Sequence, residues 1–147
     1  MSMLAIILIC LVLSTLMVAV HHETLMFITS GFLPRFSRPR RWHVGATVMV
    51  LMAAHIAEIM IFGIGLYVAG EYWNLGGLFG TEASRFHTYM YFSFSSYTSL
   101  GIGDVFPTGH LRYMSGVEAL LGLVMIGWTA SFLFLEMRTY WSVHSDK

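Results

Sequence analysis

Long apolar runs alternate with short polar segments along this chain. Residues 3–20, 44–69 and 111–135 are each long enough to cross a membrane, since a spanning helix needs about 20 mostly apolar residues. The first run ends at about Val20, or it continues through the polar letters HHE to about Phe32. The second run is interrupted by His55 and Glu58, and the third by Glu118. The pattern predicts an all-α membrane protein with three spans.

The segment between the second and third spans has a different pattern. Residues 70–83 are rich in glycine and predict an external loop. Residues 84–97, SRFHTYMYFSFSSY, contain neither Gly nor Pro and predict a helix that Ser84 caps. Such a helix is about 21 Å long, which is too short to span a bilayer and suits a re-entrant helix. The loop TSLGIGD, residues 98–104, follows directly.

Composition supports a membrane protein and excludes several other classes. The chain is 56% hydrophobic and 11% charged, whereas soluble domains carry roughly 25% charged residues. The net charge of +0 argues against a nucleic-acid partner, which requires a basic surface. The one cysteine, Cys10, excludes an intramolecular disulfide. No Lys or Arg precedes Arg35, so the first run lacks the basic start of a signal peptide and is expected to be retained.

The basic residues predict how the chain is oriented. Residues 35–43 hold Arg35, Arg38, Arg40 and Arg41, and loops rich in Lys and Arg remain in the cytoplasm. We therefore expect the N-terminus and the 98–104 loop outside and the C-terminus inside. The predicted organisation is an N-terminal transmembrane helix (1–34), a cytoplasmic basic loop (35–43), a core of two spans with the re-entrant segment (44–135), and a short cytoplasmic tail (136–147).

A glycine-rich loop at membrane depth needs a physical reason. Non-helical backbone is tolerated there only where protein buries it or where it lines a watery cavity. Glycine adopts backbone angles that other residues avoid, and rings of backbone carbonyls can replace the hydration shell of an ion. The preceding short helix would point the negative end of its dipole at the same place. Together these features favour a cation.

The run YTSLGIGDVFP resembles the selectivity-filter signature T-x-G-Y-G-D of the tetrameric potassium channel superfamily, and GVEALLGLVMIGWTASFLF resembles the inner helix of its small bacterial members. The resemblance implies a homotetrameric pore in a lipid bilayer, with 44–135 as the pore domain, 84–97 as pore helix and a bacterial inner membrane as location. It implies that monovalent cations pass along Thr98, Ser99, Leu100, Gly101, Ile102 and Gly103, and that Asp104 and Tyr97 support this filter. K⁺ would bind backbone carbonyls of Ser99, Leu100, Gly101 and Ile102 and the Ser99 hydroxyl.

Two positions depart from the family pattern. Ile102 stands where the family has an aromatic residue that packs behind the filter, and Ser99 replaces a threonine. A potassium channel and a weakly selective K⁺/Na⁺ channel therefore both remain as interpretations. The resemblance implies passive conduction without a covalent cofactor. We expect no enzyme, because no nucleophile–base pair or phosphate-binding loop is apparent.

Other polar and small residues in the spans carry further hypotheses. Gly122 is either a hinge of the inner helix or a point of close helix packing. Equal depth in a helical hairpin would bring His22 to His55 and Glu58, and Glu118 lies at a depth comparable to that of Glu58. Ionisable groups inside a membrane are functional candidates. These four residues are expected to form either a network that binds protons or a divalent metal, or a hydrogen-bond cluster that ties the helices together. A non-conducting metal-binding protein is the third functional class.

Overall fold

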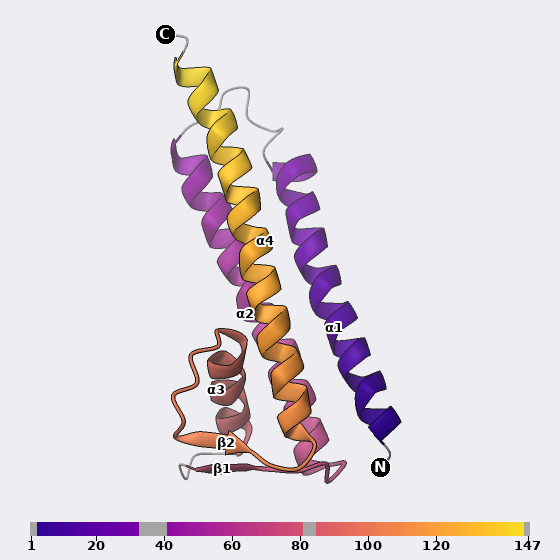
Figure 1. Cartoon of the computed structure of the whole chain (residues 1–147). Coiled ribbons are helices and arrows are strands. Elements are labelled where there is room, and N and C mark those ends of the chain that lie inside the picture. Colours follow the sequence, from indigo (N-terminus) through magenta and orange to yellow (C-terminus); the bar gives the residue numbers. More distant parts are fainter. Residues whose placement is uncertain (1–2, 33–40, 81–84, 146–147) are drawn as a thin grey trace.

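The computed structural model describes residues 3–32, 41–80 and 85–145 and places them in a helical architecture (Figure 1). Its elements, in chain order, are α1 (Met3–Met26), the π-helical turn η1 (Phe27–Phe32), α2 (Arg41–Glu71), β1 (Leu78–Gly80), α3 (Arg85–Tyr97), β2 (Val105–Pro107) and α4 (Leu111–Ser145). Three of these helices are long and apolar enough to span a membrane. The all-α membrane fold predicted from the sequence is confirmed.

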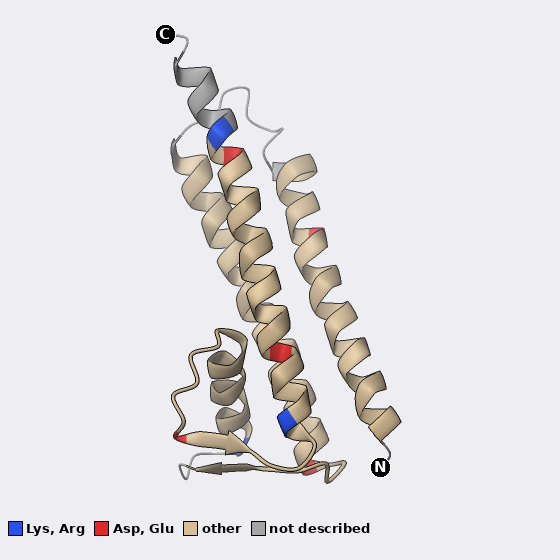
Figure 2. Ribbon diagram, viewed as in Figure 1, with Lys and Arg blue, Asp and Glu red and all other residues tan. Residues whose placement is uncertain are grey.

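The three long helices run side by side, and the short α3 lies beside one end of α2 and α4 (Figure 1). The N-terminus and both strands lie at that end, whereas the C-terminus lies at the other. Figure 2 shows how little of the described helical length carries charged side chains. Most of the outer surface is therefore apolar, as a bilayer requires.

The helix boundaries differ from expectation mainly at the ends. The first helix passes through HHE without a break and continues to Phe32 through η1, which decides between the two predicted ends. Helix α4 extends to Ser145 rather than Leu135, so the predicted tail begins as helix. The proposed cap Ser84 and the basic residues Arg35, Arg38 and Arg40 lie outside the described residues.

A small antiparallel sheet, which the sequence did not predict, joins the loops before and after the filter. Phe79 pairs with Phe106 in its centre, and their rings stack at 6.2 Å between centroids. Gly80 pairs with Val105 and has a φ of +142°. A side chain at Gly80 would overlap the Asp104 carbonyl. The sheet thus holds the end of the 98–104 loop against the segment that precedes α3.

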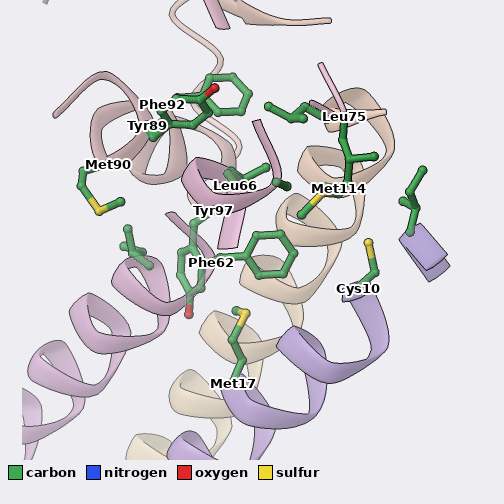
Figure 3. Close-up of a cluster of buried hydrophobic side chains, with 14 of the residues drawn as sticks. Cys10, Met17, Phe62, Leu66, Leu75, Tyr89, Met90, Phe92, Tyr97 and Met114 are labelled. Atoms are coloured by element: carbon green, nitrogen blue, oxygen red, sulfur yellow. The ribbon is translucent and has the colours of Figure 1, made fainter. Parts of the chain in front are cut away.

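The core lies where α1, α2, α3 and α4 meet (Figure 3). Met17 of α1, Phe62 of α2 and Tyr97 of α3 are buried together there. The buried residues of α1 fall on one face, at Ile6, Cys10, Met17, His21 and Leu25. His21 is therefore part of the packed face of the extra helix, although it is polar.

Candidate ion-conduction site

Helix α3 packs against α2 and α4 through its buried side chains. Five of its residues are buried, and three of them are aromatic: Tyr89, Phe92 and Tyr97. The Ser93 hydroxyl donates a 2.8 Å hydrogen bond to the Ile59 carbonyl of α2 and also contacts the Glu118 carboxyl of α4. These contacts fix the position from which the chain enters the 98–104 loop.

The sign of φ alternates along the backbone of that loop. Ser99, Gly101 and Gly103 have φ angles of 55°, 57° and 87°, whereas Leu100 and Ile102 between them do not have positive φ. Such an alternation allows the carbonyls of successive residues to line one side. The left-handed region is uncommon for a residue with a side chain, so Ser99 is held there against its own preference. Glycine removes that cost at 101 and 103.

Helix α3 braces the loop from behind through its serines and a tyrosine. The Leu100 amide donates to the Ser95 carbonyl at 3.0 Å, and the Ile102 amide lies 3.4 Å from the Ser95 hydroxyl. The Tyr91 hydroxyl donates to the Asp104 carboxylate at 2.9 Å. This bond raises the pKa of Tyr91. The sequence prediction named Asp104 as a support but missed Tyr91 and Ser95.

The side chains of the loop find little cover within their own chain. Leu100 is 68% exposed and Ile102 is 56% exposed. Apart from Gly101 itself and its two chain neighbours, no described residue has an atom within 4 Å of a Cβ built on Gly101. A groove of about 390 Å³ runs beside the loop and is lined in part by Ser99, Gly116 and Ala119. One chain therefore supplies one wall of a site that is open on its other sides.

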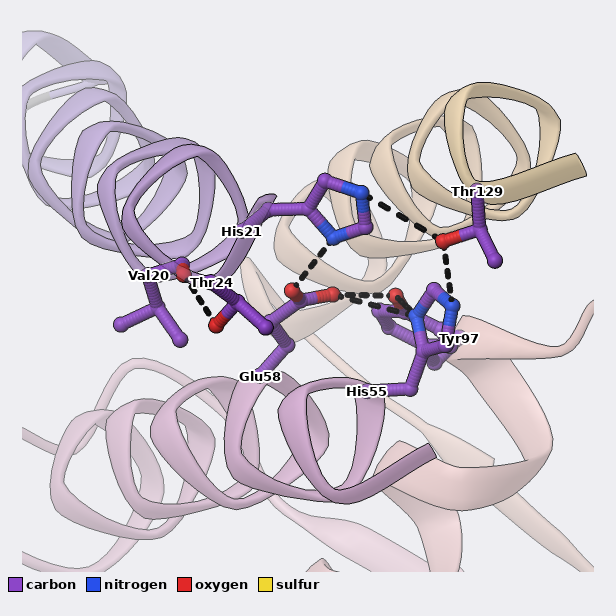
Figure 4. Close-up of polar contacts among 7 residues, drawn as sticks. All are labelled: Val20, His21, Thr24, His55, Glu58, Tyr97 and Thr129. Atoms are coloured by element: carbon purple, nitrogen blue, oxygen red, sulfur yellow. Dashed lines mark hydrogen bonds and ion pairs between the residues drawn. The ribbon is translucent and has the colours of Figure 1, made fainter. Parts of the chain in front are cut away.

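A second polar site lies deeper, between all four helices (Figure 4). His21 Nδ1 lies 2.9 Å from Glu58 Oε1, and the Tyr97 hydroxyl donates to Glu58 Oε2 at 2.5 Å. His55 Nδ1 lies 2.7 Å from the same hydroxyl, and His55 Nε2 lies 3.0 Å from Thr129 Oγ1. We call these five residues the His–Glu cluster. His21 and Glu58 are fully buried.

The structure changes the membership of the predicted network. His21, not His22, meets Glu58. The side chain of His22 is 54% exposed and lies beside Glu23, because it is turned about 100° around α1 from His21 on the buried face. Glu118 does not join the cluster and instead contacts Ser93. Thr129 and Tyr97 were not predicted as members.

At Gly122 the backbone of α4 lies close to the end of α3. A Cβ at this position would overlap the backbone carbonyl oxygen of Tyr97, the last residue of α3. This contact favours the packing interpretation of Gly122 over the hinge.

Comparison with known proteins places the chain in a family. Residues 48–138 match the family model described as ion channel. The chain belongs to that family. It is thus an integral membrane channel rather than an enzyme, and the match covers most of α2, all of α3, the 98–104 loop and most of α4. The predicted relation to the potassium channel pore-domain superfamily is confirmed.

A relative of this channel is a mouse protein named potassium channel subfamily K member 7 (Mus musculus). The two are 34% identical over 113 residues, which cover 71% of this chain and 36% of the mouse protein. The channel therefore spans little more than a third of that relative. No solved structure matches the chain.

Proposed function

We propose that this channel conducts K⁺ passively through a filter formed by residues 98–103 of four identical chains. The observation that carries the proposal is the alternating backbone of Ser99, Gly101 and Gly103 at the end of a buried short helix. Such a backbone can present the carbonyls of Ser99, Leu100, Gly101 and Ile102 to one axis, where they replace water around an ion. The similarity to a protein named as a potassium channel supports K⁺ as the ion.

Assembly into a tetramer is part of the same proposal. One loop cannot surround an ion, and the loop of a single chain is exposed on the side away from α3. Small residues of α4, Gly116 and Ala119, line the groove beside it and leave room for a neighbouring chain. Cross-linking in membranes, followed by mass measurement, should give a four-chain product. A dimer as the largest product would contradict the single-filter model.

The orientation proposed with this function has the filter mouth and the N-terminus outside. It is supported by the fact that both lie at the same end of the molecule, while the arginines of 35–43 belong to the opposite connection. Passive K⁺ movement then follows the electrochemical gradient through the filter.

A flux assay with a backbone-specific variant tests conduction. Gly101→Ala adds a methyl group where the chain leaves open space, but it forces alanine into a φ of 57°, at about 1–2 kcal/mol for each chain. We expect proteoliposomes containing the variant to lose K⁺ flux. Gly45→Ala is the matched control, because Gly45 also faces open space and has an ordinary helical backbone. If Gly101→Ala retained wild-type flux, the loop would not be part of the permeation path.

Selectivity is tested separately by reversal potentials in opposed K⁺ and Na⁺ gradients. We expect the potential to follow K⁺. A potential near zero would favour the weakly selective cation channel, for which Ile102 in place of an aromatic residue, and its exposure within the chain, give the reason. Ile102→Tyr should then move the potential toward that of K⁺.

A further inference from the structure

Two histidines of the His–Glu cluster present the same ring nitrogen to the same carboxylate. His21 Nδ1 lies 2.9 Å from Glu58 Oε1, and His55 Nδ1 lies 3.4 Å from Glu58 Oε2. These residues come from α1 and α2 and form the one group with metal-ligand spacing among the described residues. Their ligand atoms all lie within 4.8 Å of one another.

The spacing agrees with what a transition metal ion needs. Zinc binds imidazole nitrogen and carboxylate oxygen at about 2.0–2.2 Å in tetrahedral geometry, which puts the ligand atoms about 3.3–3.5 Å apart. The separation of His55 Nδ1 from Glu58 lies within that interval, and the separation of His21 Nδ1 from Glu58 is shorter than it. Small side-chain rotations therefore suffice to admit an ion, with no movement of a helix.

The opposite nitrogens of both rings share one partner. His55 Nε2 and His21 Nε2 lie 3.0 Å and 3.4 Å from the hydroxyl oxygen of Thr129 on α4. A hydroxyl oxygen can accept two hydrogen bonds, so both rings can donate Nε2–H to it when their Nδ1 atoms bind a metal. Outer hydrogen bonds of this kind fix the tautomer and orientation of histidines that bind metals. Without a metal, the Tyr97 hydroxyl donates to Glu58, so the contact of His55 Nδ1 with that hydroxyl places a proton on His55 Nδ1.

Without a metal, a proton lies between His21 Nδ1 and Glu58, and another lies between His55 Nδ1 and the Tyr97 hydroxyl. A divalent ion can replace both protons, since it binds each Nδ1 and the carboxylate at once. We propose that His21, His55 and Glu58 form a binding site for a divalent transition metal ion of the zinc type. This proposal does not depend on K⁺ conduction.

The Tyr97 hydroxyl gives the site a fourth polar neighbour. It contacts both His55 Nδ1 and Glu58 Oε2, so it lies where a ligand or a metal-bound water would be stabilised. To bind the metal, His55 Nδ1 must give up its hydrogen bond with the Tyr97 hydroxyl. Binding therefore changes a hydrogen bond of the residue that directly precedes the filter.

Cobalt(II) is a suitable probe, because in tetrahedral nitrogen and oxygen coordination it absorbs strongly in the visible range. We expect the full chain, purified in detergent, to bind one Co²⁺ per chain with such a spectrum, and Zn²⁺ to displace it. His21→Ala and Glu58→Gln should abolish the spectrum. Thr129→Val, which keeps the shape but removes the hydroxyl, should weaken binding about 10-fold or more.

The chain offers a matched control beside the site. His22→Ala removes the exposed neighbour of His21 on the same helix and should leave the spectrum and stoichiometry unchanged. Absence of bound Co²⁺ in the wild type would overturn the proposal. So would a wild-type spectrum in His21→Ala, since the metal would then lie elsewhere. If Glu58→Gln does not fold, the wild-type spectrum and Thr129→Val still decide. Because binding is measured in detergent without flux, its failure is distinct from failure of conduction.

Discussion

The hydrogen bonds of the Ser93 hydroxyl indicate which neighbouring group inside this channel carries a proton. It lies 2.8 Å from the Ile59 carbonyl oxygen and also contacts a carboxyl oxygen of Glu118. A hydroxyl has one proton to donate, and a carbonyl can only accept. If Ser93 donates to Ile59, the carboxyl of Glu118 must donate to Ser93. Glu118 is then a neutral carboxylic acid, which is the less costly form inside a membrane.

This protonation state gives a prediction for Glu118. Glu118→Gln keeps both the shape of the side chain and a hydrogen-bond donor for Ser93. We therefore expect the free energy of unfolding, measured by thermal denaturation in detergent, to change by less than about 1 kcal/mol. Ser93→Ala leaves a buried carboxyl without this partner and should cost about 1–3 kcal/mol. Infrared spectra should contain a protonated carboxyl band that Glu118→Gln removes. A band that persists in this variant would assign it to another acid and contradict the neutral state.

At the scale of elements, the contact between α3 and α4 sets the position of the 98–104 loop, the proposed filter. Gly122 allows the backbone of α4 to approach the end of α3 at Tyr97, and the chain enters the filter at the next residue. The packed face of α4 thus supports the end of the short helix α3. A larger residue at 122 would shift α3 and the loop together.

Gly122→Ala tests whether this glycine packs or bends. We expect the added methyl group to lower stability by about 1–3 kcal/mol, as overpacking does, and to reduce K⁺ flux because the filter moves with α3. In Gly127→Ala, on the same helix, the added methyl group meets open space. This variant should lower neither the stability nor the K⁺ flux. The measurements are thermal unfolding and proteoliposome flux. A hinge predicts altered flux at unchanged stability, which would contradict the packing interpretation.

The sequence predicted the helices better than it predicted which faces meet. Long apolar runs indicate spans directly, and glycine spacing indicates the filter. Helix α1 is apolar all round, so no polar face distinguished His21 from His22. Strands β1 and β2 have three residues each, too few for an alternating pattern. The membership of Thr129 and Tyr97 in the His–Glu cluster depends on how four helices pack together, which the sequence pattern does not show.

At the scale of the whole molecule, the His–Glu cluster joins the extra helix to the pore. The family match begins at residue 48, so α1 lies outside it, yet His21 of α1 contacts Glu58 of α2 and Thr129 of α4. Glu58 in turn contacts Tyr97 at the end of α3. A change at His21 can therefore reach the proposed filter through one carboxylate and one hydroxyl.

Removing His21 should alter a pore that it does not line. In His21→Ala the buried Glu58 loses a hydrogen-bond partner, at about 3 kcal/mol or more, and depends more on the Tyr97 hydroxyl. We expect lower tetramer stability and K⁺ flux reduced about five-fold or more, the lower end of typical coupling between sites. His22→Ala, one residue away and exposed, should match the wild type in both measurements. Tyr97→Phe, which removes the same link from the other side, should add little to the effect of His21→Ala on flux, because both variants interrupt one path. Additive losses in the double variant would show instead that α1 and the filter act independently.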